Sequence, residues 1–267
     1  GTLLFSADNS GYTGTIDLNG GYVAVDRSTS LSSAIAPTTV NVMGGSGIRA
    51  EMNNAINPGH APVAVPNNFT LNSDLTIVGI LDQALDLRGK FTVTGAARTL
   101  NLYNLAPTVF SGTGPNAGGV AIDVAALGIS FFNQPGTATT VSGKITGPGS
   151  GAMPGNTSIT KTNTGGNLNG TGVLILSGNN DFSGVFNINA GRVVGASNNA
   201  FGTPWGYTYT ANRAGIALRG DGLSIGENFF LEGAGASRQD NYDTLTGTLR
   251  LLDAQPGTAE TATITGM

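Results

Sequence analysis

The sequence predicts an all-β protein built as a solenoid of short strands. Three observations carry this prediction. Apolar residues alternate with small or polar ones in short runs, Gly and Asn interrupt these runs every few residues, and one long stretch recurs far along the chain. Period-two alternation indicates strands with one buried face, and Gly and Asn tolerate the positive φ angles of tight corners. Long-range recurrence is typical of stacked repeat units.

Alternating runs follow one another along most of the chain, separated by Gly, Asn, Asp or Pro. Helical periodicity is nearly absent, and the best candidate, 28–35, has room for a single turn. The alternating apolar positions are, in order, Leu3/Phe5, Ile16/Leu18, Val23/Val25, Leu85/Leu87, Phe91/Val93, Leu100/Leu102, Leu174/Leu176, Phe186/Ile188, Leu249/Leu251 and Ile264. We expect those of 3–18 and 174–188 to point into the core, and Gly14, Gly21, Gly184 and Gly191 to lie at turns or strand ends.

Composition excludes several classes of protein. The chain has 267 residues, 42 of them Gly, one His, no Cys, 10% charged residues and a net charge of −4. Disulfides and thiolate metal sites are therefore excluded. A basic cluster is lacking, which argues against nucleic-acid binding. The apolar runs fall short of the roughly 20 residues that a membrane helix needs, so we expect no membrane insertion in this segment.

The recurrence has a period of roughly 170 residues, typical of a large stacked unit. Gly14–Asn19 aligns with Gly184–Asn189, and Gly21 and Val23 align with Gly191 and Val193, with one residue of slippage. Further pairs of segments are 47–50 with 215–218, 67–71 with 227–231 and, more loosely, 85–89 with 248–251 and 91–95 with 262–266. Asn19 and Asn189 fall at equivalent corners, where Asn side chains of successive coils can stack as a hydrogen-bonded ladder.

This alignment predicts three regions. Residues 1–107 form the first copy of the long repeat, 108–169 form its Gly/Thr/Ser-rich, loop-bearing part, and 170–267 form a second, incomplete copy. The chain is then a segment of a longer tandem array. At about 20–25 residues per coil and about 4.8 Å between coils, we expect a rod of roughly 50–65 Å. The competing fold is a series of tandem β-sandwich domains, which also have short, evenly spaced strands.

The segment "GVLILSGNNDFSGVFNINAGRVVGASNNAFG" (172–202) resembles the autotransporter-associated β-strand repeat, whose pattern is close to G-x-L-x-L-S-G-x-N-x-Y-x-G-x-T-x-I-N-A-G-x-L. The opening segment matches the same pattern through Leu3, Phe5, Ser6, Asn9, Tyr12, Gly14, Ile16, Leu18, Asn19, Gly21 and Val23. The resemblance implies a right-handed parallel β-helix in a bacterial cell-surface or secreted protein. It supplies no catalytic residues.

Candidate catalytic residues are few and scattered. His60 lies between two prolines in "NPGHAPVAVP", where an exposed loop histidine is the ordinary reading and a catalytic base or metal ligand the alternative. Asp82 and Asp86 stand near Arg88 and Lys90, as a polysaccharide lyase requires, and a glycosidase would need carboxylates paired on adjacent coils. Charges on alternating, solvent-facing strand positions explain the same residues.

Binding sites are equally sparse. Asp240 and Asp243 in "RQDNYD" lack a recognised calcium-loop pattern, and the glycine pairs 44–45, 118–119 and 165–166 lack the Lys-Ser/Thr and helix of a phosphate loop. Trp205, Tyr207 and Tyr209 in "TPWGYTYT" offer rings for stacking on sugars, although covering a loop is their more ordinary role. We therefore predict no catalytic, cofactor or metal site.

The sequence thus favours a structural or adhesive extracellular repeat protein that is not an enzyme and forms a surface fibre, sheath or layer around a bacterial cell. Its expected partners are copies of itself and cell-surface glycans. Two alternatives stay open: a carbohydrate-active β-helix, such as a polysaccharide lyase or tailspike-like depolymerase, and a sugar-binding module.

Overall fold

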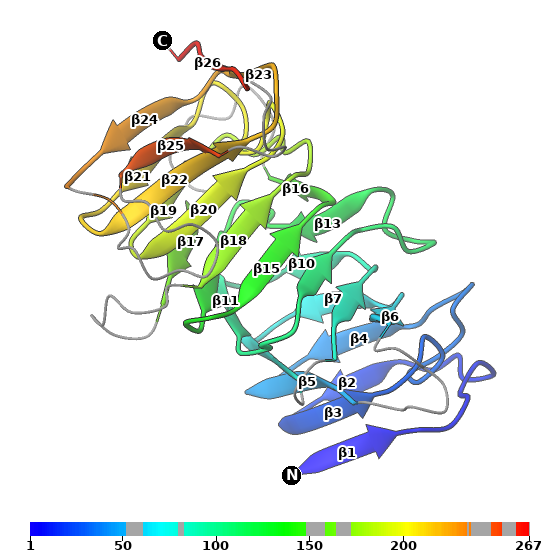
Figure 1. Cartoon of the computed structure of the whole chain (residues 1–267). Helices are drawn as coiled ribbons and strands as arrows, with labels where there is room; N and C mark the ends of the chain where they lie inside the picture. Colours follow the sequence, from blue (N-terminus) through cyan, green and yellow to red (C-terminus); the bar gives the residue numbers. More distant parts are fainter. Residues whose placement is uncertain are drawn as a thin grey trace.

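The chain winds as a stack of coils, with its N-terminus at one end and its C-terminus at the other (Figure 1). The computed structural model describes residues 1–51, 61–79, 83–147, 158–163, 172–233, 235, 247–252 and 260–266. In these ranges every regular element is a β-strand, 26 in all. The described residues hold no helix that is long and apolar enough to cross a membrane.

The largest sheet has ten strands, one from each coil, and runs the length of the stack. In order across the sheet they are β1 (Thr2–Phe5), β3 (Gly21–Val25), β5 (Ser46–Ala50), β8 (Leu75–Gly79), β11 (Arg98–Leu102), β14 (Ile129–Asn133), β17 (Ser158–Thr162), β19 (Val185–Ile188), β21 (Tyr207–Thr210) and β24 (Asn228–Leu231).

Three further sheets form the other faces of the stack. The eight-stranded sheet contains β6 (Val63–Val65), β9 (Leu85–Leu87), β12 (Thr108–Phe110), β15 (Ala138–Val141), β18 (Val173–Leu176), β20 (Gly191–Gly195), β22 (Ala214–Arg219) and β25 (Leu249–Leu252). The six-stranded sheet contains β2 (Ile16–Leu18), β4 (Thr39–Val42), β7 (Asn68–Leu71), β10 (Phe91–Val93), β13 (Val120–Asp123) and β16 (Lys144–Thr146). The two-stranded sheet pairs β23 (Leu223–Ile225) with β26 (Ala262–Ile264).

Each pair of neighbouring strands is parallel and comes from successive coils, so the fold is a parallel β-helix, as predicted. A regular coil passes through the ten-, eight- and six-stranded sheets in turn, as β8, β9 and β10 do. The alternative of tandem β-sandwiches is wrong, because the sheets of a sandwich are antiparallel. The right-handed sense of winding stays a prediction.

The coils are longer than expected. In the ten-stranded sheet Thr2 pairs with Tyr22 and Arg98 with Ile129, so one coil takes from 20 to 31 residues. Ten strands leave nine intervals of about 4.8 Å, which gives a stack of about 43 Å rather than 50–65 Å. The connections between the strands absorb the extra residues.

The core is a column of inward-facing apolar side chains shared by all coils. Leu174, Leu176, Phe186 and Ile188 are fully buried, as predicted, and Leu18 is nearly so. Phe5 and Ile16 are partly buried and pack against the same core. Leu3 is the exception, with 61% of its side chain exposed. It belongs to β1, the edge strand of the ten-stranded sheet, which has a neighbouring coil on one side only.

Phenylalanine rings stack along this column from coil to coil. Phe69 and Phe91, which are register partners on β7 and β10, have ring centroids 4.5 Å apart and nearly parallel planes. Phe91 also meets Phe110 edge to face at 5.1 Å. Pairs of this kind contribute about 0.5–1.5 kcal/mol beyond the area that they bury. The inner face of the strands therefore couples successive coils.

The two repeat copies form the same local structure. Leu3 pairs with Val23 in the first copy, and their aligned counterparts Leu174 and Val193 pair in the second. The next coil agrees as well, because Val23 pairs with Ile48 as Val193 pairs with Ile216. The ladder register therefore confirms the alignment through 50 and 218.

The copies occupy different faces of the solenoid. The first places β1, β2 and β3 in the ten-, six- and ten-stranded sheets, whereas the second places β18, β19 and β20 in the eight-, ten- and eight-stranded sheets. Both copies form a strand, skip the next face, form a strand and return to the first face. Six coils separate β1 from β17, and β18 follows on the next face. One long repeat thus advances by six coils and one face.

This offset corrects the two looser alignments. Leu249 pairs with Ile216 just as Ile77 pairs with Ile48, so the counterpart of Leu249 is Ile77 rather than Leu85. Likewise β26 pairs with β23 in the two-stranded sheet, whereas a counterpart of β10 would extend the ten-stranded sheet. A pattern of alternating apolar residues fits any strand of a solenoid and does not specify its face.

The predicted loop-bearing region, 108–169, contributes β12 to β17 to the three large sheets. Its residues 148–157 and 164–169 lie outside the described residues. The region boundaries after 107 and 169 stay a prediction.

Candidate functional site

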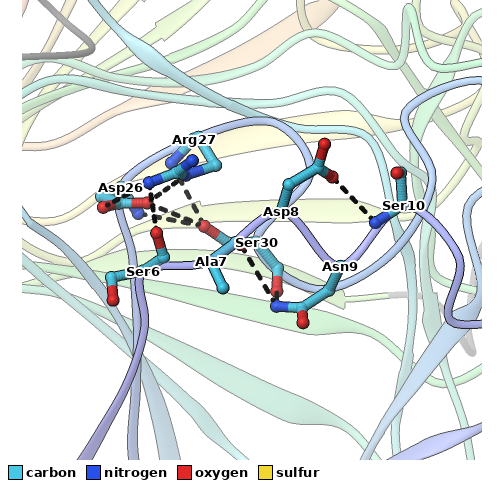
Figure 2. Close-up of polar contacts among 8 residues, drawn as sticks. All are labelled: Ser6, Ala7, Asp8, Asn9, Ser10, Asp26, Arg27 and Ser30. Carbon is cyan, nitrogen blue, oxygen red and sulfur yellow. Dashed lines mark hydrogen bonds and ion pairs between the residues drawn. The ribbon is translucent and has the colours of Figure 1, made fainter.

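The repeat copies carry their most specific contacts at a polar corner, shown for the first copy in Figure 2. Asn9 donates from its backbone N to the carbonyl of Thr29 at 3.0 Å and from Nδ2 to the carbonyl of Ser30 at 2.6 Å. Asp8 accepts a hydrogen bond from the backbone N of Ser10 at 2.9 Å, which closes an Asx turn. This bond holds the pKa of the exposed Asp8 carboxyl below its usual value. The loop of one coil is thereby fastened to the turn of the next.

A buried carboxylate completes this corner. Asp26 is 2% exposed and accepts hydrogen bonds from Nε of Arg27 at 3.0 Å and from Oγ of Ser30 at 3.2 Å. Arg27 also donates to the carbonyl of Ser6 on the preceding coil. Because Asp26 is buried, the neighbouring guanidinium supplies the charge compensation that the carboxylate requires.

The second copy contains the same fastening in a buried setting. Asn180, the counterpart of Asn9, donates from Nδ2 to the carbonyl of Ala200 at 2.7 Å, and Ala200 takes the place of Ser30. Its Oδ1 accepts a hydrogen bond from the backbone N of Ile145 at 2.7 Å. An amide side chain offers both donors and an acceptor, so Asn180 links the coil before it to the coil after it. The shared role of Asn9 and Asn180 is structural.

The predicted corner ladder of Asn19 and Asn189 is not what the repeat uses. Both side chains are exposed, and the contacts that the two copies share fall on Asn9 and Asn180 instead. The glycines after these corners behave as predicted. Gly21 and Gly191 open β3 and β20 with φ angles of +77° and +79°, a region that other residues rarely adopt. Gly14 and Gly184 lie just before β2 and β19.

The candidate acids do not form a paired-carboxylate site within the described part of the chain. Asp86 is bound by Nε of Arg88 at 2.6 Å and accepts from Oγ of Ser111 at 2.7 Å. Its partners on the adjacent coils are Ala64 and Val109, whereas a glycosidase would need a second carboxylate there.

The remaining outward acids are similarly isolated. Asp17 pairs in register with Asn41, whose Nδ2 donates to its Oδ1 at 2.8 Å, and Asp123 lies between Thr92 and Thr146. In the described ranges, no three His, Cys, Asp or Glu residues come together as metal ligands would. His60, Asp82, Asp240 and Asp243 lie outside the described residues.

Two buried ionisable groups escaped the sequence analysis. Lys161 points into the core from β17, where burial lowers its pKa to about 7, and its Nζ donates to the carbonyl of Thr162 at 2.9 Å. Glu227 is 2% exposed, and burial raises its pKa to about 8 although Thr208 donates to its Oε1 at 3.1 Å. The alternation of "SITKT" places Lys161 on the same side as the core residue Ile159, which is the signal that could have revealed it.

The aromatic residues near β21 are exposed rather than folded against the body. Trp205 is 59% and Tyr209 44% exposed, so covering a loop is not their role. Tyr207 and Tyr209 meet edge to face at 5.3 Å on the outer side of β21. Of the residues singled out as candidate sites, these are the ones that the structure brings together on an open surface.

Comparison with known families confirms the predicted resemblance. Residues 1–25 and 168–194 match the model of the passenger-associated-transport-repeat, and together they make up about a fifth of the chain. These are the two segments that form equivalent coils. The chain therefore contains a passenger-associated repeat region of an autotransporter type. The search of curated proteins and the search of solved structures returned no match.

Proposed function

We propose that this chain is a structural segment of a passenger exported to the surface of a bacterial cell. Its β-helix serves as a rigid rod and performs no catalysis. The observation that carries the proposal is the placement of both repeat copies in one continuous parallel ladder with a single shared core. A repeat that extends a rod in this way suits a spacer or fibre, because each coil supports only its neighbours.

The rod is proposed to belong to a tandem array of the long repeat that forms a fibre, sheath or surface layer. Low charge and outward Thr, Ser and Asn side chains support close packing of copies without strong repulsion. Six coils and one face correspond to an axial advance of about 30 Å per repeat, accompanied by about a third of a turn. Three repeats would return each surface feature to the same face after about 90 Å.

Electron microscopy of the native bacterial surface tests this proposal. The expected result is elongated rods or lattices with an axial spacing near 30 Å and a longer repeat near 90 Å. Compact particles, or fibres whose features recur on one face at every repeat, would contradict the array.

The absence of catalysis is tested separately with purified protein and pectin, alginate, hyaluronan and capsule extracts. We expect no release of unsaturated or reducing sugar ends. Turnover that disappears in Asp86→Asn, Asp82→Asn or His60→Ala would replace the structural role with a carbohydrate-active one.

A further inference from the structure

The strongest unexplained feature of the surface is an aromatic cluster, defined here as Trp205, Tyr207, Tyr209 and Phe230. Tyr209 and Phe230 are register partners on β21 and β24, and their rings stack at 4.7 Å with planes 22° apart. Tyr207 meets the same Phe230 ring edge to face at 5.8 Å. Phe230 is 50% exposed, and Trp205 stands in the turn that leads into β21. The rings thus form an ordered group that remains open to solvent.

The repeat fold does not require these rings, because the chain itself contains an aligned set without them. β4 pairs with β2 as β21 pairs with β19, and β7 follows β4 as β24 follows β21. The positions equivalent to Tyr207, Tyr209 and Phe230 are Thr39, Asn41 and Thr70 in the first copy. Small polar side chains therefore satisfy this face of the solenoid. The aromatic cluster is an addition specific to the second copy.

The surroundings of the cluster carry no formal charge. The outward side chains beside it on β17, β19 and β24 are polar or aliphatic, namely Ser158, Thr160, Val185, Asn187 and Asn228. A charged ligand would gain no ion pair here and would lose its hydration. An uncharged partner with both apolar and hydroxyl groups fits this surface.

The size of the cluster argues against a protein partner. Three side chains of at most about 200 Å² each, exposed by roughly half, offer about 300 Å² of surface. A stable protein–protein interface buries about 800 Å² on each partner. A surface of about 300 Å² is in the range of the largest apolar patch on an ordinary monomer, which is often functional.

We propose that the aromatic cluster binds an uncharged saccharide by stacking on its pyranose rings. The aliphatic C–H face of a sugar ring carries partial positive charge and is attracted to the negative face of an aromatic ring. The amides of Asn187 and Asn228 flank the cluster and both donate and accept hydrogen bonds, as the hydroxyls at the rim of the sugar require. A rod on a cell surface would in this way hold neutral glycan chains beside it.

The chain offers a direct probe of this site, because Trp205 is its only tryptophan. Intrinsic fluorescence is measured as the purified protein is titrated with cellohexaose, xylohexaose, maltohexaose and chitohexaose, with hexagalacturonate as the acidic comparison. We expect a saturable change with at least one neutral oligosaccharide and none with hexagalacturonate. Calorimetry repeats the titration on Tyr209→Ala and Phe230→Ala, in each of which binding should weaken about tenfold or more.

The matched control is Tyr22→Ala, because Tyr22 is also exposed on the outer side of the ten-stranded sheet but lies at the opposite end. It should bind as the parent does. Circular dichroism shows that each variant is folded. Failure of all four neutral probes to bind, or equal loss in Tyr22→Ala, overturns the proposal. Self-association that depends on concentration and disappears in Tyr209→Ala would also overturn it, in favour of a second copy as the occupant.

Discussion

Replacing Asn180 with alanine should reveal how strongly the repeat fastens its coils. The substitution removes two hydrogen bonds and leaves the backbone N of Ile145 and the carbonyl of Ala200 without these partners. Asn180 is 1% exposed, so water cannot readily replace the amide. Leaving a buried polar group unsatisfied costs about 1–3 kcal/mol, and the two groups together give a loss of about 2–6 kcal/mol in the free energy of unfolding.

Asn9→Ala is the matched control in the other copy. Asn9 is half-buried, and its bond to Ser30 is open to replacement by water, so the loss should be about 0.5–1.5 kcal/mol. Asn180→Asp separates the two bonds of Asn180, because a carboxylate still accepts from Ile145 but cannot donate to Ala200.

Urea denaturation followed by circular dichroism measures all three variants. An Asn180→Ala loss no larger than that of Asn9→Ala would refute the reasoning. An Asn180→Asp variant as stable as the parent would refute the role of the bond to Ala200.

Three further predictions follow from buried positions. Ile188→Asp should cost more than about 4 kcal/mol, whereas Asn187→Asp on the outer face should stay within about 0.5 kcal/mol; equal melting temperatures would contradict the inward assignment. Unfolded Lys161 stays protonated up to pH 10.5 but the folded residue only up to about 7, so the advantage of Lys161→Met over the parent should be full below pH 7 and vanish by about 10.5. A constant difference between pH 7 and 10.5 would disprove this. Folded Glu227 keeps its proton up to about pH 8 but the unfolded residue only up to 4.5, so parent stability relative to Glu227→Gln should fall as pH rises between these values; a flat difference in urea titrations would contradict it.

The sequence predicted the type of fold because its signals are local. Alternation marks the strands, and Gly21 and Gly191 mark corners that need positive φ. The register of the two copies was also accessible, since an aligned pair such as Leu174 and Val193 forms the same ladder contact as Leu3 and Val23.

The face on which each strand lies was not accessible from the sequence. It depends on the accumulated length of every earlier coil, and coils here vary from 20 to 31 residues. The pairing of Leu249 with Ile216 and the one-face offset between the copies therefore required the structure. Exposure of Trp205 and Tyr209 was equally hidden, because the same residues suit a covering role or an open one.

Paired cysteines test the central claim, that the second copy continues the ladder of the first on a shifted face. The chain has no native cysteine. Thr160 and Asn187 are register partners on β17 and β19, so their Cα atoms lie about 4.8 Å apart, within the span of a disulfide. Thr160→Cys with Asn187→Cys should cross-link under mild oxidation as a monomer, as seen by non-reducing electrophoresis and peptide mapping. Thr162→Cys with Asn187→Cys, two residues out of register and more than about 7 Å apart, should remain reduced. Cross-linking of the second pair in preference to the first would contradict the account.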